Sequence, residues 1–327
     1  MLLQTKIQIP HFENQINYNQ EILTIGSCFS AVIGQKLLER KFKTLNNPFG
    51  TIFNPLSIIK LLQYSLNGKF FSEDLITQHQ GRYLHYDFHS DISGNSPSDL
   101  MEKIKVSTER TAKILKEASA LIITFGTAHV YEYIKSSTTV ANCHKQAGQL
   151  FNKRLLSISE ILHDFDLFHN KLIQINPNIQ IILTVSPVRH IKDGIAENQL
   201  SKSLLRLLCH EISSQYAQAN YFPSYEIMMD ELRDYRFYKE DMIHPTAQAE
   251  DYIWERFSQS FFSEDTRNKI LLIENIIKSL SHKAFNPKGG AHQKFLSNLL
   301  LKMEQLEPEF DFSDEINQVK AKFNPTN

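Results

Sequence analysis

The chain has 327 residues, of which 42% are hydrophobic and 22% are charged, and its formal net charge at pH 7 is −1. This composition is typical of a soluble globular protein. A charge so close to zero excludes the strong positive field expected of a protein that binds nucleic acid or an anionic membrane. The first residues, MLLQTKIQIP, hold no apolar run long enough for a signal peptide. No stretch approaches the length of a membrane span. Since Cys28, Cys143 and Cys209 fit no disulfide framework, we expect a cytoplasmic protein with no membrane or nucleic-acid partner.

Apolar runs typical of buried strands alternate with helical patterns along most of the chain. The expected strands are Ile22–Ile25, Lys43–Leu45, Leu121–Phe125, Ile179–Val185 and a short run at Tyr221 and Phe222. The expected helices are one that contains Phe29, Ile33 and Leu37, one over Leu155–Leu172, one after Asn198, and one after a cap at Thr246. This alternation predicts an α/β fold with crossover helices.

Two parts of the chain depart from the alternation. Residues 67–99 are polar and rich in His, Tyr and Asp, which predicts an insertion lying over the sheet, where α/β enzymes place segments that shape the substrate site. Beyond about residue 265 the pattern is purely helical. We therefore expect a domain of residues 1–265, which includes the insertion, and a helical extension of residues 266–327 packed on it.

The string ILTIGSCFS, from Ile22 to Ser30, brings a Ser and a Cys to the point where an apolar strand turns into a helix. Gly26 permits a tight turn, because glycine tolerates backbone angles that other residues resist. Ser27 and Cys28 would then lie at the carboxyl edge of the sheet. There the free N–H groups of the helix start stabilise an oxyanion or a thiolate. The structural alternative is that Ser27 caps the helix and Cys28 fills a small buried space.

The string DMIHPTAQ, from Asp241 to Gln248, places a carboxylate three residues before an imidazole. The Asp241 carboxylate can hold one nitrogen of His244 while the other nitrogen faces a nucleophile. The structural alternative is a loop His beside an incidental Asp. A nucleophile at a strand-to-helix turn, combined with a distant acid–His pair, is one layout for acyl-transfer chemistry.

Together these strings resemble the SGNH hydrolase superfamily, often called GDSL-like, and more specifically the GSCFA-domain family, whose motif here is Gly26-Ser27-Cys28-Phe29-Ser30. The other segments that carry the resemblance are Asn47–Pro55, Gly81–Asp91, Val140–Lys145, Ser186–His190 and Asp241–Pro245. The resemblance implies a flavodoxin-like three-layer α/β/α sandwich with a parallel sheet and an active site at the sheet's carboxyl edge. It also implies ester hydrolysis or acyl transfer, with no cofactor and no metal.

The superfamily's first and last blocks give the candidate catalytic residues their roles. The first block, Gly-Asp-Ser-Leu-Ser, puts Cys28 at the nucleophile position. A shift by one residue makes Ser27 the nucleophile but loses the matches that follow it. On this register Cys28 is favoured and Ser27 remains a rival; a thiol is able to act as the nucleophile, because a helix start and a nearby His lower its pKa. The last block, Asp-x-x-His, makes Asp241 the orienting acid and His244 the general base.

The oxyanion blocks match less completely. Gly50 is the best match to the glycine whose N–H binds the oxyanion. The third block, Gly-x-Asn-Asp, corresponds to GTAH beginning at Gly126, so Ala128 stands where the Asn should be. Thr127 or Asn142 would have to supply the missing donor, and the loss of one such donor costs about 3 kcal/mol of transition-state stabilisation.

A metal site is a rival interpretation of the insertion. On an extended strand, His85, Asp87 and His89 would project from one face, and two imidazoles with a carboxylate can bind zinc. The favoured interpretation is a polar strand that shapes a substrate pocket. The leading hypothesis is therefore an SGNH-type esterase or acyltransferase acting on a small-molecule or carbohydrate acyl ester. The alternative is a non-catalytic ligand-binding protein that has lost hydrolysis.

Overall fold

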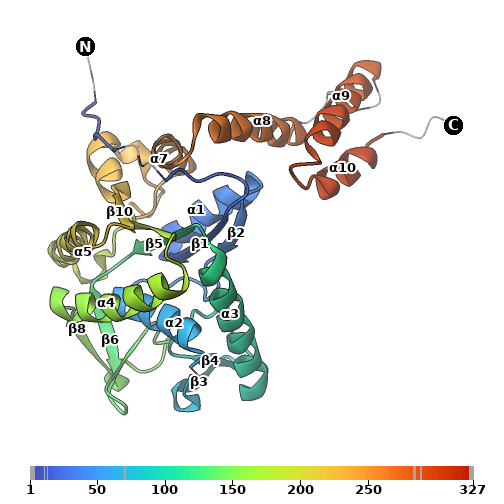
Figure 1. The fold of residues 1–327 in the computed structure, drawn as a ribbon. Helices are drawn as coiled ribbons and strands as arrows, with labels where there is room; N and C mark the ends of the chain where they lie inside the picture. Colours follow the sequence, from blue (N-terminus) through green and yellow to red (C-terminus); the bar gives the residue numbers. More distant parts are fainter. Residues whose placement is uncertain are drawn as a thin grey trace.

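The computed structural model describes residues 4–10, 12, 14–69, 71–282, 285–287 and 289–323. Its centre is a sheet of five parallel strands in the order β10-β9-β5-β1-β2 (Figure 1). The strands are β1 (Glu21–Gly26), β2 (Lys43–Asn46), β5 (Ala120–Phe125), β9 (Gln180–Val185) and β10 (Ala219–Phe222). Counted along the chain within this sheet, the order is 2-1-3-4-5, which is that of flavodoxin-like folds. The strand order reverses between β1 and β5.

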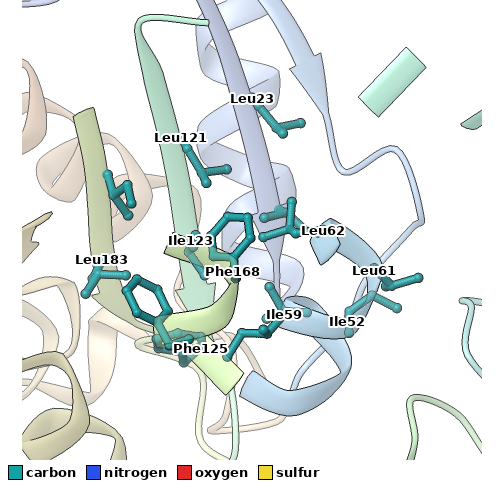
Figure 2. Packing of buried hydrophobic residues seen from close by; sticks show 14 of the residues in the cluster. Leu23, Ile52, Ile59, Leu61, Leu62, Leu121, Ile123, Phe125, Phe168 and Leu183 are labelled. Carbon is teal, nitrogen blue, oxygen red and sulfur yellow. The ribbon is translucent and has the colours of Figure 1, made fainter. Parts of the chain in front are cut away.

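Helices cover both faces of the sheet, so the predicted three-layer α/β/α sandwich is confirmed. One face carries α1 (Cys28–Glu39) and α7 (Ala247–Phe261). The other face carries α2 (Pro55–Asn67), α3 (Pro97–Glu117), α4 (Ile158–Ile175) and α5 (Ile195–Gln215). Strand residues alternate between the two cores: Ile122 packs with the first face, and Leu121 and Ile123 pack with the second. Figure 2 shows members of the second core from β1, β5 and β9 together with Phe168 of α4.

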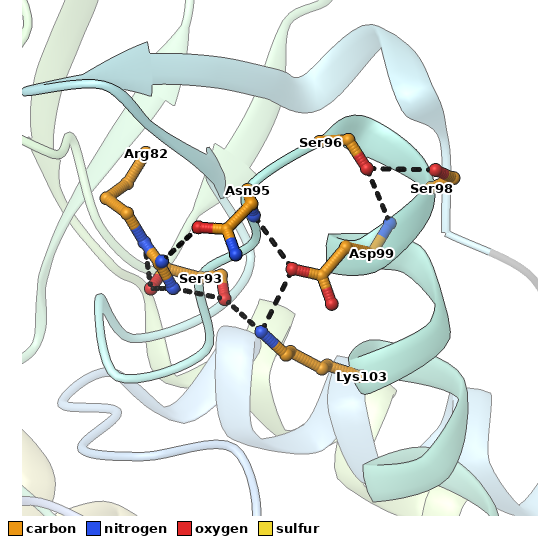
Figure 3. Close-up of polar contacts among 7 residues, drawn as sticks. All are labelled: Arg82, Ser93, Asn95, Ser96, Ser98, Asp99 and Lys103. Carbon is orange, nitrogen blue, oxygen red and sulfur yellow. Dashed lines mark hydrogen bonds and ion pairs between the residues drawn. The ribbon is translucent and has the colours of Figure 1, made fainter.

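The polar insertion contains an ordered hairpin. Its antiparallel strands are β3 (Ile76–His79) and β4 (Arg82–His85). Ser96 caps α3 by accepting the N–H of Asp99 at 3.1 Å. Arg82 of the hairpin and Lys103 of α3 donate to the carbonyl of Ser93, at 3.0 and 2.9 Å. Figure 3 shows how this network ties the hairpin to the start of α3.

A second small sheet, which the sequence did not predict, follows β5. Its antiparallel strands are β6 (His129–Tyr133), β7 (Thr138–Val140) and β8 (Phe151–Leu155), in the order β7-β6-β8. The prediction of a helix from Leu155 is wrong at its start, because Leu155 ends β8. Helix α4 begins at Ile158, after Ser157, whose hydroxyl accepts the N–H of Glu160 at 3.3 Å.

The C-terminal part is helical, as predicted. It consists of α8 (Glu264–Leu280), α9 (Gly290–Leu306) and α10 (Ser313–Lys320). Their buried apolar residues join the same core as α1 and α7. Ion pairs reinforce this contact, with Arg40 2.7 Å from Glu274 and Lys41 2.6 Å from Glu315. In the part of the chain that the structure describes, no helix is both long enough and apolar enough to cross a bilayer.

Candidate active site

The turn after β1 delivers Cys28 to the start of α1. Gly26 has φ +141°, and a Cβ added there would lie 2.2 Å from the carbonyl oxygen of Thr124 on β5. Only glycine fits this close approach of the two paired strands. The N–H of Ser27 then donates to the same Thr124 carbonyl at 3.0 Å. The strand therefore ends and the helix begins within two residues.

The two candidate nucleophiles differ in their surroundings. Ser27 is 0% exposed, and within the described residues its hydroxyl has no hydrogen-bond partner, not even the cap bond to α1 that the structural alternative requires. Cys28 is half-buried and lines a cleft. Burial raises the pKa of the Cys28 thiol, while the Phe29 N–H and the positive charge of Lys202 act in the opposite direction. Only Cys28 of the two faces the cleft, and it does so as a thiol.

A turn built on Asp241 holds His244. The imidazole Nδ1 lies 2.7 Å from Asp241 Oδ2, and Asp241 Oδ1 accepts the N–H groups of Ile243 at 2.9 Å and His244 at 3.0 Å. The N–H and imidazole of His244, followed by the N–H of Ile243, hold the pKa of Asp241 well below its usual value. Because a carboxylate only accepts, Nδ1 carries the proton and Nε2 is left as an acceptor.

This turn bends sharply at Met242, whose φ of +58° lies in the left-handed region that non-glycine residues rarely adopt. The Met242 carbonyl accepts a hydrogen bond of 2.6 Å from Nη2 of Arg189 in the loop after β9. The acid–His pair is thereby fixed from a second part of the chain. A strained residue held in this way is a common feature of functional sites.

Cys28 and His244 line one cleft of about 590 Å³. Thr127, which follows β5, and residues 188–193, which follow β9, line the same cleft. The cleft therefore lies where β1, β5 and β9 end, beside the point where the strand order reverses. Open α/β sheets bind their ligands at this position.

No hydrogen bond joins His244 to Cys28 or Ser27 among the residues that the structure describes. The structure therefore contains one of the two hydrogen bonds expected of a nucleophile–His–Asp arrangement, the bond between Asp241 and His244. Catalytic hydrogen bonds are often long in ligand-free structures and shorten when the substrate binds. The geometry thus brings Cys28 and His244 to one cleft, with Asp241 bound to the imidazole, but in the described part of the chain no hydrogen bond joins His244 to Cys28.

The predicted oxyanion donors are only partly placed at the cleft. Thr127 lines it, and its hydroxyl lies 3.2 Å from Ser201 Oγ and accepts the N–H of His129 at 3.1 Å. Gly126 lies directly before Thr127, but its N–H donates to the Phe53 carbonyl at 2.8 Å. Of the predicted oxyanion donors, Thr127 therefore lines the cleft, and His129 of the same segment lines it too.

Gly50 and Asn142 do not offer the donors expected of them. The N–H of Gly50 closes a turn by donating to the Asn47 carbonyl at 2.8 Å, so it is not free to bind an oxyanion. The side chain of Asn142 accepts the N–H of His144 at 2.9 Å in the loop after β7. Neither residue is among those that line the cleft.

Sequence reasoning assigned no role to Lys202, which lies beneath the cleft. This residue of α5 is 1% exposed, and its Nζ donates to the carbonyl oxygens of Gly126 and Ser186, each at 2.8 Å. Burial lowers the pKa of Lys202 to about 7, and Cys28 opposes this shift. A signal was present in the sequence, since Lys202 occupies the same helical stripe as Leu205 and Ile212.

His190 also lines the cleft without an assigned role. Its ring meets the Phe53 ring edge-on at 5.2 Å, and within the described residues its buried Nε2 has no hydrogen-bond partner. Burial, followed by the charges of Lys202 and His244, lowers the pKa of His190 to about 4. It is therefore neutral at pH 7. The signal for His190 was its place just after a predicted strand, at the sheet's carboxyl edge.

The alternative metal site of the insertion is not formed. Strand β4 ends at His85, so His85, Asp87 and His89 do not share one face of an extended strand. Asp87 pairs with Lys60 at 2.7 Å, and the His85 Nε2 lies 3.0 Å from the carbonyl oxygen of Ser72. Over the described ranges, no group of three or more His, Cys, Asp or Glu residues is placed to hold a metal ion.

Larger cavities lie away from these residues. One, of about 660 Å³, is lined by Gln20, Ser119 and Gln180, which precede or begin strands β1, β5 and β9 at the opposite edge of the sheet. A second, of about 870 Å³, lies between α7 and α8, and a third, of about 650 Å³, lies between α8 and α9. None of them is lined by Cys28, Ser27 or His244, so the smaller cleft is the candidate site despite its size.

Comparisons with solved structures give distant similarities. A carbohydrate esterase family 3 protein from Talaromyces cellulolyticus has 8% sequence identity and a TM-score of 0.31, over 78% of this chain and 99% of that chain. An acetyl xylan esterase from the rumen bacterium Butyrivibrio proteoclasticus has 11% identity and a TM-score of 0.31, over 80% of this chain and 67% of that chain. Similarity at this level transfers no function. No curated protein sequence matches the chain.

Two family models match the chain. The model described as the GSCFA family matches residues 21–257, and the model described as the C-terminal domain of GSCFA domain proteins matches residues 273–325. The first match includes all five strands of the central sheet, Cys28 and the turn that carries Asp241 and His244. The chain belongs to the GSCFA family.

Proposed function

We propose that this protein is an esterase or acyltransferase of SGNH type, with Cys28 as nucleophile, His244 as general base and Asp241 as the acid that orients it. One observation carries the proposal: Cys28 and His244, from distant parts of the sequence, line a single cleft at the carboxyl edge of the sheet. Asp241 supports it by holding the far nitrogen of the imidazole at 2.7 Å. Ser27 is buried outside this cleft. The substrate we propose is a small-molecule or carbohydrate acyl ester.

The reaction begins with attack of the Cys28 sulfur on the ester carbonyl carbon. Because burial keeps the thiol protonated, His244 Nε2 takes its proton during the attack, as the carbonyl electrons move to oxygen. We expect the N–H of Cys28, at the start of α1, to donate to the resulting oxyanion. Collapse of the tetrahedral intermediate breaks the ester C–O bond, and the departing alkoxide takes the proton from His244.

The second half of the reaction releases the acyl group from the thioester. Water gives a proton to His244 and attacks the thioester carbonyl; collapse breaks the C–S bond and returns the proton to sulfur. The products are a carboxylic acid and the free thiol. An alcohol in place of water gives acyl transfer by the same steps. The Asp241 carboxylate stabilises the imidazolium that forms in both halves.

Hydrolysis of p-nitrophenyl acetate tests the assignment. We expect Cys28→Ala and His244→Ala to lower kcat/KM by about 10³-fold or more, because each removes a group that acts in the transition state. Ser27→Ala is the matched control, and its activity should stay within about threefold of the wild type, a difference of less than 1 kcal/mol. Iodoacetamide should inactivate the enzyme with the label on Cys28. Full activity of Cys28→Ala or His244→Ala would refute the mechanism.

The open contact between His244 and Cys28 favours one second candidate, a protein that binds an acyl ester without turning it over. A screen of acetylated sugars, short-chain esters and thioesters separates the two. Turnover, or an acyl adduct on Cys28 seen by intact mass, supports the enzyme. Ligand-induced stabilisation with neither adduct nor turnover supports the binding protein.

A further inference from the structure

Lys202 is a buried cation whose hydrogen bonds go to backbone. Its Nζ donates to the carbonyl of Gly126, just after β5, and to that of Ser186, just after β9, both at 2.8 Å. Within the described residues no carboxylate pairs with it, and the Tyr225 ring lies 5.5 Å away. Burial of a charge without a counter-ion is unfavourable, and such groups concentrate at functional sites.

The ammonium group shares a sheet edge with the candidate nucleophile. Gly26 of β1 pairs with Thr124 of β5, and the N–H of Ser27 donates to the Thr124 carbonyl. Gly126, which accepts from Lys202, follows two residues later on the same chain. Neighbouring strands lie about 4.8 Å apart, so the Gly126 carbonyl that Lys202 binds and the start of α1 lie at the ends of two adjacent strands.

We propose that Lys202 is a positioning residue whose positive charge stabilises the thiolate that Cys28 forms during attack, while its two hydrogen bonds fix the strand ends under the cleft. The inference rests on the proposed function in one respect, the choice of Cys28 as nucleophile. The charges that act on Cys28 are those of Lys202 from α5 and Glu250 from α7, and they act in opposite directions. His190, in the loop after β9, is the other titratable group nearby, and the charges of Lys202 and His244 act on it.

The directions of the two pKa shifts agree with an interaction between Lys202 and Cys28. Burial raises the pKa of Cys28, and the charge of Lys202 opposes that rise. Burial likewise lowers the pKa of Lys202 to about 7, and Cys28 opposes that fall. The coupling between two such groups is reciprocal. It is largest where Lys202 is charged, which is at and below about pH 7.

Alkylation of Cys28 by iodoacetamide, followed by mass spectrometry from pH 6 to pH 10, tests the charge directly. Lys202→Met removes the charge and both hydrogen bonds, whereas Lys202→Gln keeps an amide donor without the charge. In both variants we expect the rate at pH 6 to 7 to fall by about tenfold. The wild-type and variant rates should converge at alkaline pH, where Lys202 is neutral.

Arg206→Met is the matched control on the same helix. It breaks the 2.9 Å ion pair with Glu226 and leaves the cleft untouched, so it should reduce stability while the alkylation rate stays within about twofold. Wild-type alkylation rates in both folded Lys202 variants would overturn the proposal, and so would a rate ratio that does not change with pH.

A second measurement leaves Lys202 in place. Cys28→Asp and Cys28→Asn have side chains of nearly the same shape and differ by one charge. We expect the Lys202 Cε resonance, observed by NMR with labelled lysine, to titrate at higher pH in Cys28→Asp than in Cys28→Asn. Equal titration would overturn the proposal. Neither measurement needs turnover, so a failure here is distinct from a failure of the proposed esterase activity.

Discussion

The ion pair between Lys60 and Asp87 anchors the insertion that reaches the cleft. Lys60 of α2 lies 2.7 Å from Asp87, and their side chains are 22% and 3% exposed. Two residues further on, His89 lines the cleft, and its N–H donates to the Phe49 carbonyl at 3.2 Å. Breaking this pair therefore tests how the polar insertion is held against the core.

Lys60→Met leaves a buried carboxylate without its partner, a change that costs about 3–5 kcal/mol. Protonation limits the part of this cost that is due to the charge, since neutralising an ordinary Asp costs about 1.4 kcal/mol for each pH unit above about 3.9, or about 4 kcal/mol at pH 7. We expect a loss of about 3–4 kcal/mol at pH 7 and of less than about 1 kcal/mol at pH 4. Asp87→Asn should cost only about 1–2 kcal/mol, because the partly exposed Lys60 can turn to solvent.

Urea unfolding at pH 7 and pH 4 measures these differences. Lys69→Met is the control. Lys69 lies 5.6 Å from the Tyr64 ring and Lys60 lies 5.8 Å from the same ring, but the Lys69 side chain is exposed. Removal of Lys69 should therefore lower the free energy of unfolding by no more than about 0.5 kcal/mol. The double variant Lys60→Met/Asp87→Leu should recover to within about 1 kcal/mol of the wild type. An equal loss at both pH values for Lys60→Met would refute the buried charge as the cause.

Three further predictions concern the folded state. Gly26→Ala should destabilise the protein by about 3 kcal/mol or more in thermal unfolding, since its Cβ would lie 2.2 Å from the Thr124 carbonyl at a φ of +141°; a change below 1 kcal/mol would contradict the close approach. Ser96→Ala should cost about 1 kcal/mol through loss of the α3 cap, as measured by urea unfolding. Burial raises the pKa of Cys143 to about 11 and also raises that of Cys209, above the ordinary thiol value of 9.0. Above pH 9 the native state thus binds more protons than the unfolded state, so unfolding free energy should fall from pH 8 to pH 10; no fall would contradict these shifts.

The central sheet could be predicted because its strands carry their own signal. Strands such as β5, with every residue buried, read as continuous apolar runs, and glycines mark where they end. The small sheet β6 to β8 carries no such signal, because β6 and β8 are mostly half-exposed and mix charged with aromatic residues. The pairing of β6 with β8 joins segments separated by β7, which local patterns do not encode.

The candidate site likewise has one part that the sequence predicts and another part that it does not. The Asp241–His244 contact is predictable because an Asp carboxylate that accepts the N–H groups two and three residues later brings the imidazole of that third residue within reach. Whether Ser27 or Cys28 faces the cleft depends on how the turn after β1 presents the first residues of α1, and no motif register determines that. The failure at Gly50 has a similar origin, because the N–H that the motif offers is used to close the turn itself.

The buried positive charge of Lys202 can be explained from the place where helix α5 packs on the sheet. A lysine in the middle of a buried helical stripe cannot extend to solvent, so its ammonium group must find acceptors inside. Within a sheet nearly all carbonyls are used by the strand ladder, but those just past the strand ends are free to accept. Helix α5 starts at the carboxyl edge after β9, and Lys202 lies in its first half, so the carbonyls of Gly126 and Ser186 are within its reach. In a flavodoxin-like fold, a lysine at such a position therefore indicates a positive charge beneath the edge where ligands bind.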